Sequence, residues 1–268
     1  MRLDGKVVFL TGAGAGIAKA TARMCAREGA KVAICEINRE AGERAEREIR
    51  QEGGDALFVH ADVTQDESVR EAIAKTVERF GTLTTLFNCA GGSSQEDHPV
   101  HKMDLDVWHK TVALNLLHPF LTCRYGIPHM MKAGTGSIVN VTSHLGLTGS
   151  VKPAYAACKG GIVSFTKTLA AQYADYGIRA NAIGPGSVRT ERQIARYENK
   201  DFLSAEKPHA TARERAVVQK LYPFSRGEPD DIAAIAVFLA SDESRMVTGT
   251  TIAADGGRSS YLRVYAGE

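Results

Sequence analysis

The chain has 268 residues, of which 44% are hydrophobic and 24% are charged, as in an ordinary globular protein. Its net charge of +2 does not provide the basic field on which nucleic-acid binding depends. The longest uninterrupted apolar run, 232–240, is about half as long as a membrane-spanning helix, and the apolar residues near the start are too few for a signal peptide. We therefore expect neither a nucleic-acid partner nor a membrane.

The cysteines indicate a reducing compartment. They are odd in number, widely spaced and form no Cys-x-x-Cys pair. Cysteines of this kind are typical of reduced thiols in an intracellular protein, so we expect a cytoplasmic location.

Short β-branched runs alternate with longer amphipathic stretches along the chain. Strands are expected at 6–10, 31–35, 56–60, 83–89, 137–141, 179–183 and 250–253. Helices are expected at 16–29, 39–51, 68–80, 104–131, 153–176 and 228–240. In the first helix, Ala20, Met24 and Cys25 are available for the inner face.

This alternation predicts parallel βαβ units, and continuously apolar strands predict a sheet that is covered on both faces. We therefore expect one α/β domain over residues 1–268, a doubly wound, Rossmann-type fold whose mostly parallel sheet has helices on both faces. The stretch 187–225 breaks the pattern, and we expect it to form a lid over the substrate.

A glycine-rich turn joins the first strand to the first helix. Gly12, Gly14 and Gly16 let the backbone approach a pyrophosphate, which the helix amides and dipole then face. Glu36 ends the second strand, where a carboxylate can accept both ribose hydroxyls of NAD but would repel the 2′-phosphate of NADP. The alternatives are that the glycines form an ordinary tight turn and that Glu36 is a solvated loop carboxylate. We prefer NAD as cofactor.

A phenol and an ammonium group lie four residues apart in a predicted helix. Tyr155 and Lys159 share one helix face, and Ser143 follows a strand that ends at the cofactor crevice. Oxidising an alcohol requires a base for its O–H proton. A nearby lysine cation lowers the phenol pKa from about 10 towards the working range. An exposed tyrosine beside a solvated lysine is the alternative, which Ser143 makes less attractive.

With these motifs the chain resembles the short-chain dehydrogenase/reductase family in its short, single-domain form. The family's Thr-Gly-x-x-x-Gly-x-Gly fingerprint is present with Ala18 in place of the last glycine. Asp62-Val63 matches the pair that contacts adenine, and 88–91 matches the Asn-Asn-Ala-Gly turn with Cys89 as the second residue. The stretch 254–257 matches the C-terminal Ala-Asp-Gly-Gly signature.

The resemblance implies catalytic roles for four residues. Tyr155 would be the general base in oxidation and the acid in reduction, and Lys159 would lower its pKa and hold the nicotinamide ribose. Ser143 would bind the substrate oxygen, although the spacing to Tyr155 leaves Thr142 as an alternative hydroxyl. Asn115 would hold a proton-relay water, or else be a polar helix residue that is bonded locally.

The cofactor site follows from the same resemblance. The stretch 185–190 matches a Pro-Gly-x-x-x-Thr segment that lies against the nicotinamide. The residues expected to contact the cofactor are Gly12, Gly14, Ala15, Gly16, Ile17, Glu36, Asp62, Val63, Asn88, Ala90, Gly91, Tyr155, Lys159, Pro185, Gly186, Val188 and Thr190.

The substrate side is less defined. Ser143, His144 and Arg189 are candidate substrate contacts. Basic residues outnumber acidic ones in 187–225, which is typical either of a clamp for an anionic substrate or of a solvated lid. No histidine or cysteine cluster has metal-ligand spacing, so we expect no catalytic metal.

These observations together predict an NAD-dependent oxidoreductase that interconverts a secondary alcohol and a ketone in a small soluble metabolite. An NADP-linked carbonyl reductase of the same fold and a non-catalytic dinucleotide-binding sensor are the alternatives. The resemblance also implies a homo-oligomer, since short relatives are commonly tetramers.

Overall fold

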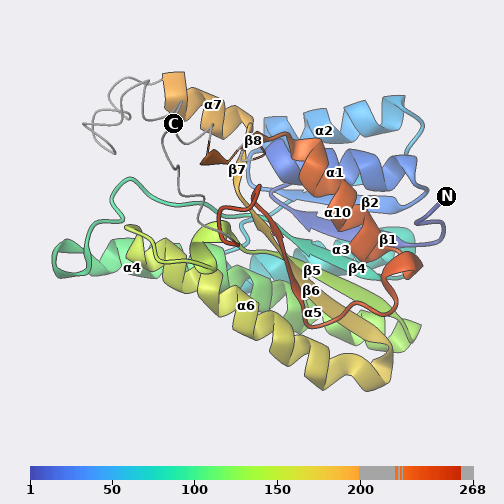
Figure 1. The fold of residues 1–268 in the computed structure, drawn as a ribbon. Coiled ribbons are helices and arrows are strands. Elements are labelled where there is room, and N and C mark those ends of the chain that lie inside the picture. Colours follow the sequence, from blue (N-terminus) through green and yellow to red (C-terminus); the bar gives the residue numbers. More distant parts are fainter. Residues whose placement is uncertain (199–220, 223, 225, 261–268) are drawn as a thin grey trace.

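Seven parallel strands form the centre of the computed structural model, which describes residues 1–198, 221, 222, 224 and 226–260 (Figure 1). Their order across the sheet is β3-β2-β1-β4-β5-β6-β9. The strands are β1 (Val7–Thr11), β2 (Lys31–Glu36), β3 (Ala56–His60), β4 (Thr85–Asn88), β5 (Gly136–Val141), β6 (Ile178–Pro185) and β9 (Thr251–Ala254). A separate parallel pair joins β7 (Ser187–Val188) to β8 (Arg226–Gly227). The strand order reverses between β1 and β4, which opens a crevice at the carboxyl ends of these strands.

Helices cover both faces of this sheet. Figure 1 shows α1, α2 and α10 on one face and α3, α5 and α6 on the other. The helices are α1 (Gly16–Arg27), α2 (Arg39–Gln51), α3 (Asp66–Phe80), α4 (Leu105–Val112), α5 (His118–Ala133), α6 (Pro153–Tyr173), α7 (Glu191–Glu198) and α10 (Pro229–Ala240). None of the described helices has both the length and the apolar character that are needed to cross a bilayer.

The first four residues of strand β1 are apolar because both faces of the strand are buried. Val8 and Leu10 pack into the core under α1 and α10, whereas Val7 and Phe9 pack into the core on the opposite face. All five residues of the strand are buried. The predicted two-sided α/β sheet is therefore confirmed, because a strand buried on both faces cannot alternate apolar and polar residues.

Two local predictions need correction. Cys25 and Met24 pack into the core under α1 as expected, Cys25 buried and Met24 partly buried, whereas Ala20 is not part of this core; the other buried residues of the helix are Ala18, Thr21 and Ala22. Ala20 lies two residues from both Ala18 and Ala22 and so points away from them. The stretch 104–131 is not one helix, since a π-helical segment, Ala113–Leu117, separates α4 from α5. Much of the expected lid at 187–225 lies outside the described residues.

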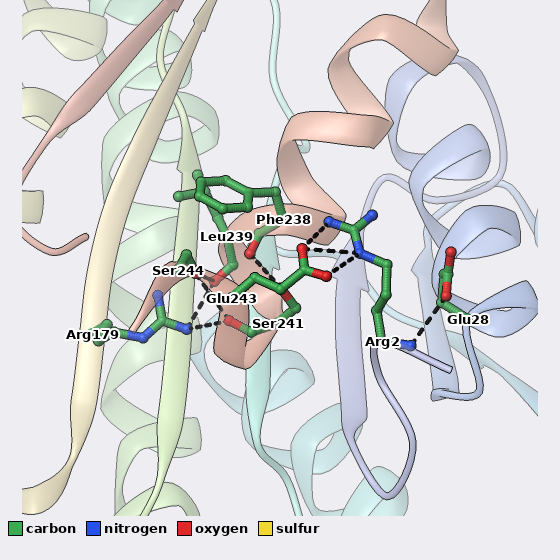
Figure 2. A network of polar contacts seen from close by, with 8 residues as sticks. All are labelled: Arg2, Glu28, Arg179, Phe238, Leu239, Ser241, Glu243 and Ser244. Atoms are coloured by element: carbon green, nitrogen blue, oxygen red, sulfur yellow. Dashed lines mark hydrogen bonds and ion pairs between the residues drawn. The ribbon is translucent and has the colours of Figure 1, made fainter. Parts of the chain in front are cut away.

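A polar network closes the C-terminal end of α10 (Figure 2). Arg179 on β6 donates to the carbonyl oxygens of Leu239 (3.0 Å) and Ser241 (3.1 Å). The hydroxyl of Ser244 donates to both carbonyl oxygens at 3.0 Å. These carbonyls lie in or beside the last turn of the helix and have no N–H partner within it, so the network supplies their hydrogen bonds. At the surface, Arg2 pairs with Glu243.

Candidate active site

The turn after β1 has glycine where the backbone requires it. Gly12 and Gly16 have positive φ angles of 69° and 56°. A Cβ on Gly12 would lie 3.0 Å from the Cα of Ala90, in the turn after β4. The hydroxyl of Thr11 accepts hydrogen bonds from the amides of Cys89 (3.0 Å) and Ala90 (3.1 Å). The two turns therefore meet at the crevice with little space between their backbones.

Glu36 is fixed at the end of β2 by the same turn. One oxygen of its carboxylate accepts from the amide of Gly14 (3.1 Å), and the other accepts from the amide of Asn38 (3.0 Å). A Cβ on Gly14 would lie 2.8 Å from the Cγ of Glu36, so this position has room only for glycine. The carboxylate is thus held beside the crevice in one orientation.

A crevice of about 630 Å³ brings together most of the predicted site residues. Those that line it are Gly12, Ala15, Gly16, Ile17, Glu36, Ala90, Gly91, Ser143, Tyr155, Lys159, Pro185, Gly186, Val188 and Thr190. A more open groove of about 970 Å³ along β3 and α3 contains none of the predicted site residues. The crevice of about 630 Å³ is therefore the candidate active site.

Tyr155 and Lys159 occupy the first two turns of α6 and face the crevice together. The Nζ of Lys159 lies 5.7 Å from the centre of the Tyr155 ring and donates to the carbonyl of Val141 at 2.8 Å. Only 4% of Lys159 is exposed. Burial of the ammonium group lowers the pKa of Lys159 to about 8. A cation with this pKa is still mostly charged at neutral pH.

Two neighbouring hydroxyls follow β5, and their hydrogen bonds differ. Thr142 donates to the backbone carbonyl of Lys159 at 2.6 Å, which ties α6 to the sheet. The Oγ of Ser143 accepts from the amide of Leu145 at 3.2 Å, which leaves the hydroxyl hydrogen available for donation. Both residues line the crevice, but only Ser143 retains a donor for a substrate oxygen.

Asn115 lies in the π-helical segment and is completely buried. Its Oδ1 accepts from the amide of Gly92 at 2.9 Å, and its Nδ2 donates to the carbonyls of Gly92 (3.1 Å) and Thr111 (3.0 Å). It lines a smaller hollow of about 190 Å³ that shares Gly92 with the main crevice. Asn115 thus fixes the backbone at the edge of the site.

Other predicted residues lie next to the crevice without lining it. Gly14 and Val63 are buried in the turns after β1 and β3. Asn88 donates to Asn140 below the turn, and the Asp62 carboxylate accepts from both the amide and the hydroxyl of Thr64.

Two of the three candidate substrate residues, His144 and Arg189, do not line the crevice and instead contact other parts of the protein. A ring nitrogen of His144 lies 3.2 Å from the carbonyl oxygen of Pro185, and burial lowers the pKa of this histidine. Arg189 forms an ion pair with Glu228 at 2.9 Å, and most of both side chains is exposed.

A short strap, Thr190–Arg192, crosses the crevice and was not predicted as such. The carboxylate of Glu191 accepts from the amide of Gly16 at 3.0 Å. The guanidinium of Arg192 donates to the carbonyls of Gly91 (3.0 Å) and Ser93 (3.1 Å). The strap therefore joins the turn after β1 to the turn after β4.

A buried histidine below the crevice was also missed. Nδ1 of His118 lies 3.0 Å from the carbonyl of Leu114, and Nε2 lies 2.9 Å from the hydroxyl of Thr11. A carbonyl can only accept, so Nδ1 carries the hydrogen, and Nε2 accepts from Thr11. Burial lowers the pKa of His118 to about 3, which keeps the ring neutral.

Comparison with known proteins gives a consistent result. A family model described as enoyl-(acyl carrier protein) reductase matches residues 12–259. The 2,5-dichloro-2,5-cyclohexadiene-1,4-diol dehydrogenase LinX of Sphingobium indicum is 38% identical over 264 residues, covering 96% of this chain and 98% of LinX. Cyclohexanol dehydrogenase of an Acinetobacter species is 34% identical over 261 residues, covering 97% of each chain.

A solved structure agrees with these relatives. The crystal structure of levodione reductase superposes with a TM-score of 0.87 at 31% identity, covering 97% of this chain and 100% of that chain. The residues matched by the family model, 12–259, include the glycine turn from Gly12 and the helix of Tyr155 and Lys159. The chain therefore belongs to the short-chain dehydrogenase/reductase family, whose oxidoreductases use a nicotinamide dinucleotide.

Proposed function

We propose that the protein is an NAD-dependent oxidoreductase that interconverts a secondary alcohol and a ketone. The observation that carries this proposal is the placement of Tyr155, Lys159 and Ser143 around the crevice that the glycine turn borders. A phenol, a buried cation and a hydroxyl donor form an acid/base site, and the glycine turn provides amides for a pyrophosphate.

The residues around the crevice fit a dinucleotide. Gly12, Ala15 and Gly16 line the crevice, so the backbone at the N-terminus of α1 borders it, as phosphate binding requires. The carboxylate of Glu36, held by Gly14 and Asn38, would accept the ribose hydroxyls and oppose a 2′-phosphate. When bound, a nicotinamide dinucleotide would supply the hydride acceptor for alcohol oxidation and the hydride donor for ketone reduction.

The side chains of Tyr155, Lys159 and Ser143 would carry out the proton transfer. Tyr155 would remove the hydroxyl proton of the alcohol, and the ammonium of Lys159 would stabilise the phenolate. Ser143 would donate to the substrate oxygen and so orient it for proton transfer. Asn115, through both of its bonds to Gly92, would keep the edge of the site in place. Positioned acid/base groups of this kind typically contribute about 10²–10⁴ in rate.

We propose an uncharged cyclic secondary alcohol as the substrate. LinX and cyclohexanol dehydrogenase are named for alcohols on six-membered carbon rings. Arg189 and Arg192, two of the basic residues in the stretch 187–225, already bind Glu228 and two backbone carbonyls. A screen of cyclic, linear and acidic secondary alcohols with NAD, followed at 340 nm, tests this choice. Faster turnover of the acidic alcohols would contradict it.

Replacing Tyr155 with phenylalanine tests the chemistry. We expect turnover to be abolished, while the dissociation constant of NADH, from fluorescence titration, stays within a few-fold of the wild-type value. Tyr173→Phe, on the same helix, is the matched control and should retain turnover. Wild-type kcat in the Tyr155→Phe variant would refute the role of the phenol. NADH binding without turnover of any alcohol or ketone by the wild-type protein would favour a dinucleotide-binding sensor.

The cofactor preference has its own test. We expect a higher kcat/KM with NAD than with NADP, and Glu36→Ala should reduce this preference by removing the charge that opposes the 2′-phosphate. A wild-type preference for NADP would support the carbonyl reductase alternative.

We further propose that the protein is a homotetramer. Apolar side chains that are partly exposed, among them Trp108, Leu117 and Phe120, lie along α4, the π-helical segment and α5. Exposed aromatic groups of this kind are typical of contact surfaces. Light scattering after gel filtration measures the mass directly, and a monomer would contradict the proposal.

A further inference from the structure

Asp97 places a buried carboxylate against the start of the helix that carries Tyr155 and Lys159. It belongs to the segment between β4 and α4, and only 1% of it is exposed. Its Oδ1 accepts from the amide of Ala154 at 3.1 Å, and its Oδ2 accepts from the amide of Tyr155 at 3.0 Å. Both carboxylate oxygens are therefore used at the first turn of α6.

The N-terminus of α6 depends on this carboxylate for its hydrogen bonds. The first residue, Pro153, has no N–H group, and the amide of Ala156 is already bonded to the carbonyl of Lys152. The amides of Ala154 and Tyr155 remain without an intrahelical acceptor. The preceding residue, Lys152, has no acceptor in its side chain, so Asp97 takes the place of the usual N-cap from a distant part of the chain.

Capping alone does not explain why the acceptor is a buried carboxylate. A serine or aspartate at position 152 would cap the same amides and remain near solvent. Burying a carboxylate carries a desolvation cost that local capping avoids. The distant cap does what a local cap cannot, because it ties the segment at the edge of the crevice to the backbone of Tyr155. Gly92, which belongs to the same segment, is bonded to Asn115.

We propose that Asp97 is a positioning residue for the reaction and acts through the backbone of Tyr155. The inference rests on the proposed function, since it assumes that the phenol of Tyr155 transfers the proton. A displacement of about 1 Å at a reacting group can reduce a rate by about 10²-fold. Two bonds to the first turn of α6, one of them to Tyr155 itself, limit such displacement.

The first test compares two aspartates in the segment between β4 and α4. Asp97→Ala should lower kcat for alcohol oxidation by about 10- to 100-fold and leave KM and the dissociation constant of NADH within about twofold. Asp104→Ala is the matched control. Asp104 is exposed and caps α4 by accepting from the amide of Asp106 at 2.8 Å, and its loss should leave kcat within about twofold. Should Asp97→Ala not fold, Asp97→Asn keeps the volume and one acceptor, and a smaller fall in kcat is expected.

The second test restores the cap without restoring the tether. Lys152→Asp supplies an acceptor directly before α6 and is made alone and together with Asp97→Ala. Hydrogen exchange at the amides of Ala154 and Tyr155 should accelerate at least tenfold in Asp97→Ala and slow again in the double variant. If Asp97 acts by tying Tyr155 to the segment at the edge of the crevice, kcat should stay low in the double variant although the protection is restored.

Two results would overturn the proposal: wild-type kcat in Asp97→Ala, or recovery of kcat together with protection in the double variant, which would show that Asp97 only caps α6. Failure of the proposed function looks different. The wild-type protein would then oxidise no alcohol with either dinucleotide, while hydrogen exchange would still report whether Asp97 holds the start of α6.

Discussion

The carboxylate of Glu191 accepts a hydrogen bond from the backbone amide of Gly16 at 3.0 Å. This amide belongs to the N-terminus of α1, where a dinucleotide phosphate binds in folds of this type. The protein thus places its own negative group where a negative ligand is expected. A dinucleotide has to displace this carboxylate or bind beside a like charge.

We therefore expect Glu191→Ala to bind NADH more tightly than the wild-type protein, by about two- to fivefold. Glu191 is exposed, so salt should screen its charge, and the gain should shrink in 0.5 M sodium chloride. Fluorescence titration of NADH at both salt concentrations measures the effect. Weaker binding by Glu191→Ala would show that the carboxylate supports the cofactor site instead of competing for it.

Lys159 illustrates a conflict between stability and the proposed chemistry. Burial lowers its pKa from 10.5 to about 8, so between these values the unfolded chain binds more protons than the folded one. Stability therefore rises as the pH increases from 8 to 10.5. Below pH 8 the burial of the charged ammonium is fully unfavourable, at roughly 3 kcal/mol.

Lys159→Met should accordingly abolish turnover and yet raise the free energy of unfolding at pH 7, by up to about 3 kcal/mol. The gain should diminish as the pH approaches 10.5, because the wild-type lysine then loses its charge. Urea unfolding at pH 7 and pH 10 gives the comparison, with Lys167→Met, an exposed lysine on the same helix, as the control. A destabilised Lys159→Met protein at pH 7 would contradict this account of its burial.

The neutral state of His118 predicts a loss of stability in acid. Its pKa is lowered from 6.5 to about 3, so the unfolded chain binds one more proton between these values, and stability decreases as the pH falls. Between pH 7.5 and 4.5 the loss is about 2–3 kcal/mol. His118→Gln cannot titrate and should lose correspondingly less, whereas His98→Gln, an exposed control, should follow the wild-type protein. Equal losses in all three proteins, measured by urea unfolding, would exclude His118 as the cause.

Local patterns in the sequence predicted the fold and much of the candidate site. Apolar strands and the glycines that end helices can be recognised from residues close together in the sequence. Tyr155 and Lys159 are one helical turn apart, so helix geometry places them on the same face. The π-helical segment around Asn115 was missed because the helical pattern continues through it.

Contacts from irregular segments could not be predicted in this way. Asp97 and Tyr155 are 58 residues apart, and their pairing depends on the path of a segment without regular structure. Glu191 stands in a stretch of mixed charge, where a carboxylate that binds Gly16 looks the same as a solvated one. The roles of Asp97 and Glu191 can be recognised only from a structure that shows which backbone amides need a hydrogen-bond acceptor.

The two arginines in Figure 2 should contribute very differently to stability. Arg179 is partly buried and donates to two carbonyls at the end of α10, so Arg179→Met should lower the free energy of unfolding by about 1–2 kcal/mol. Arg2 and Glu243 form a surface pair with side chains 34% and 53% exposed, which solvent and salt screen. Arg2→Ala should therefore have a much smaller effect that disappears in 1 M salt. Urea unfolding of both variants tests this order, and a larger loss in Arg2→Ala would reverse it.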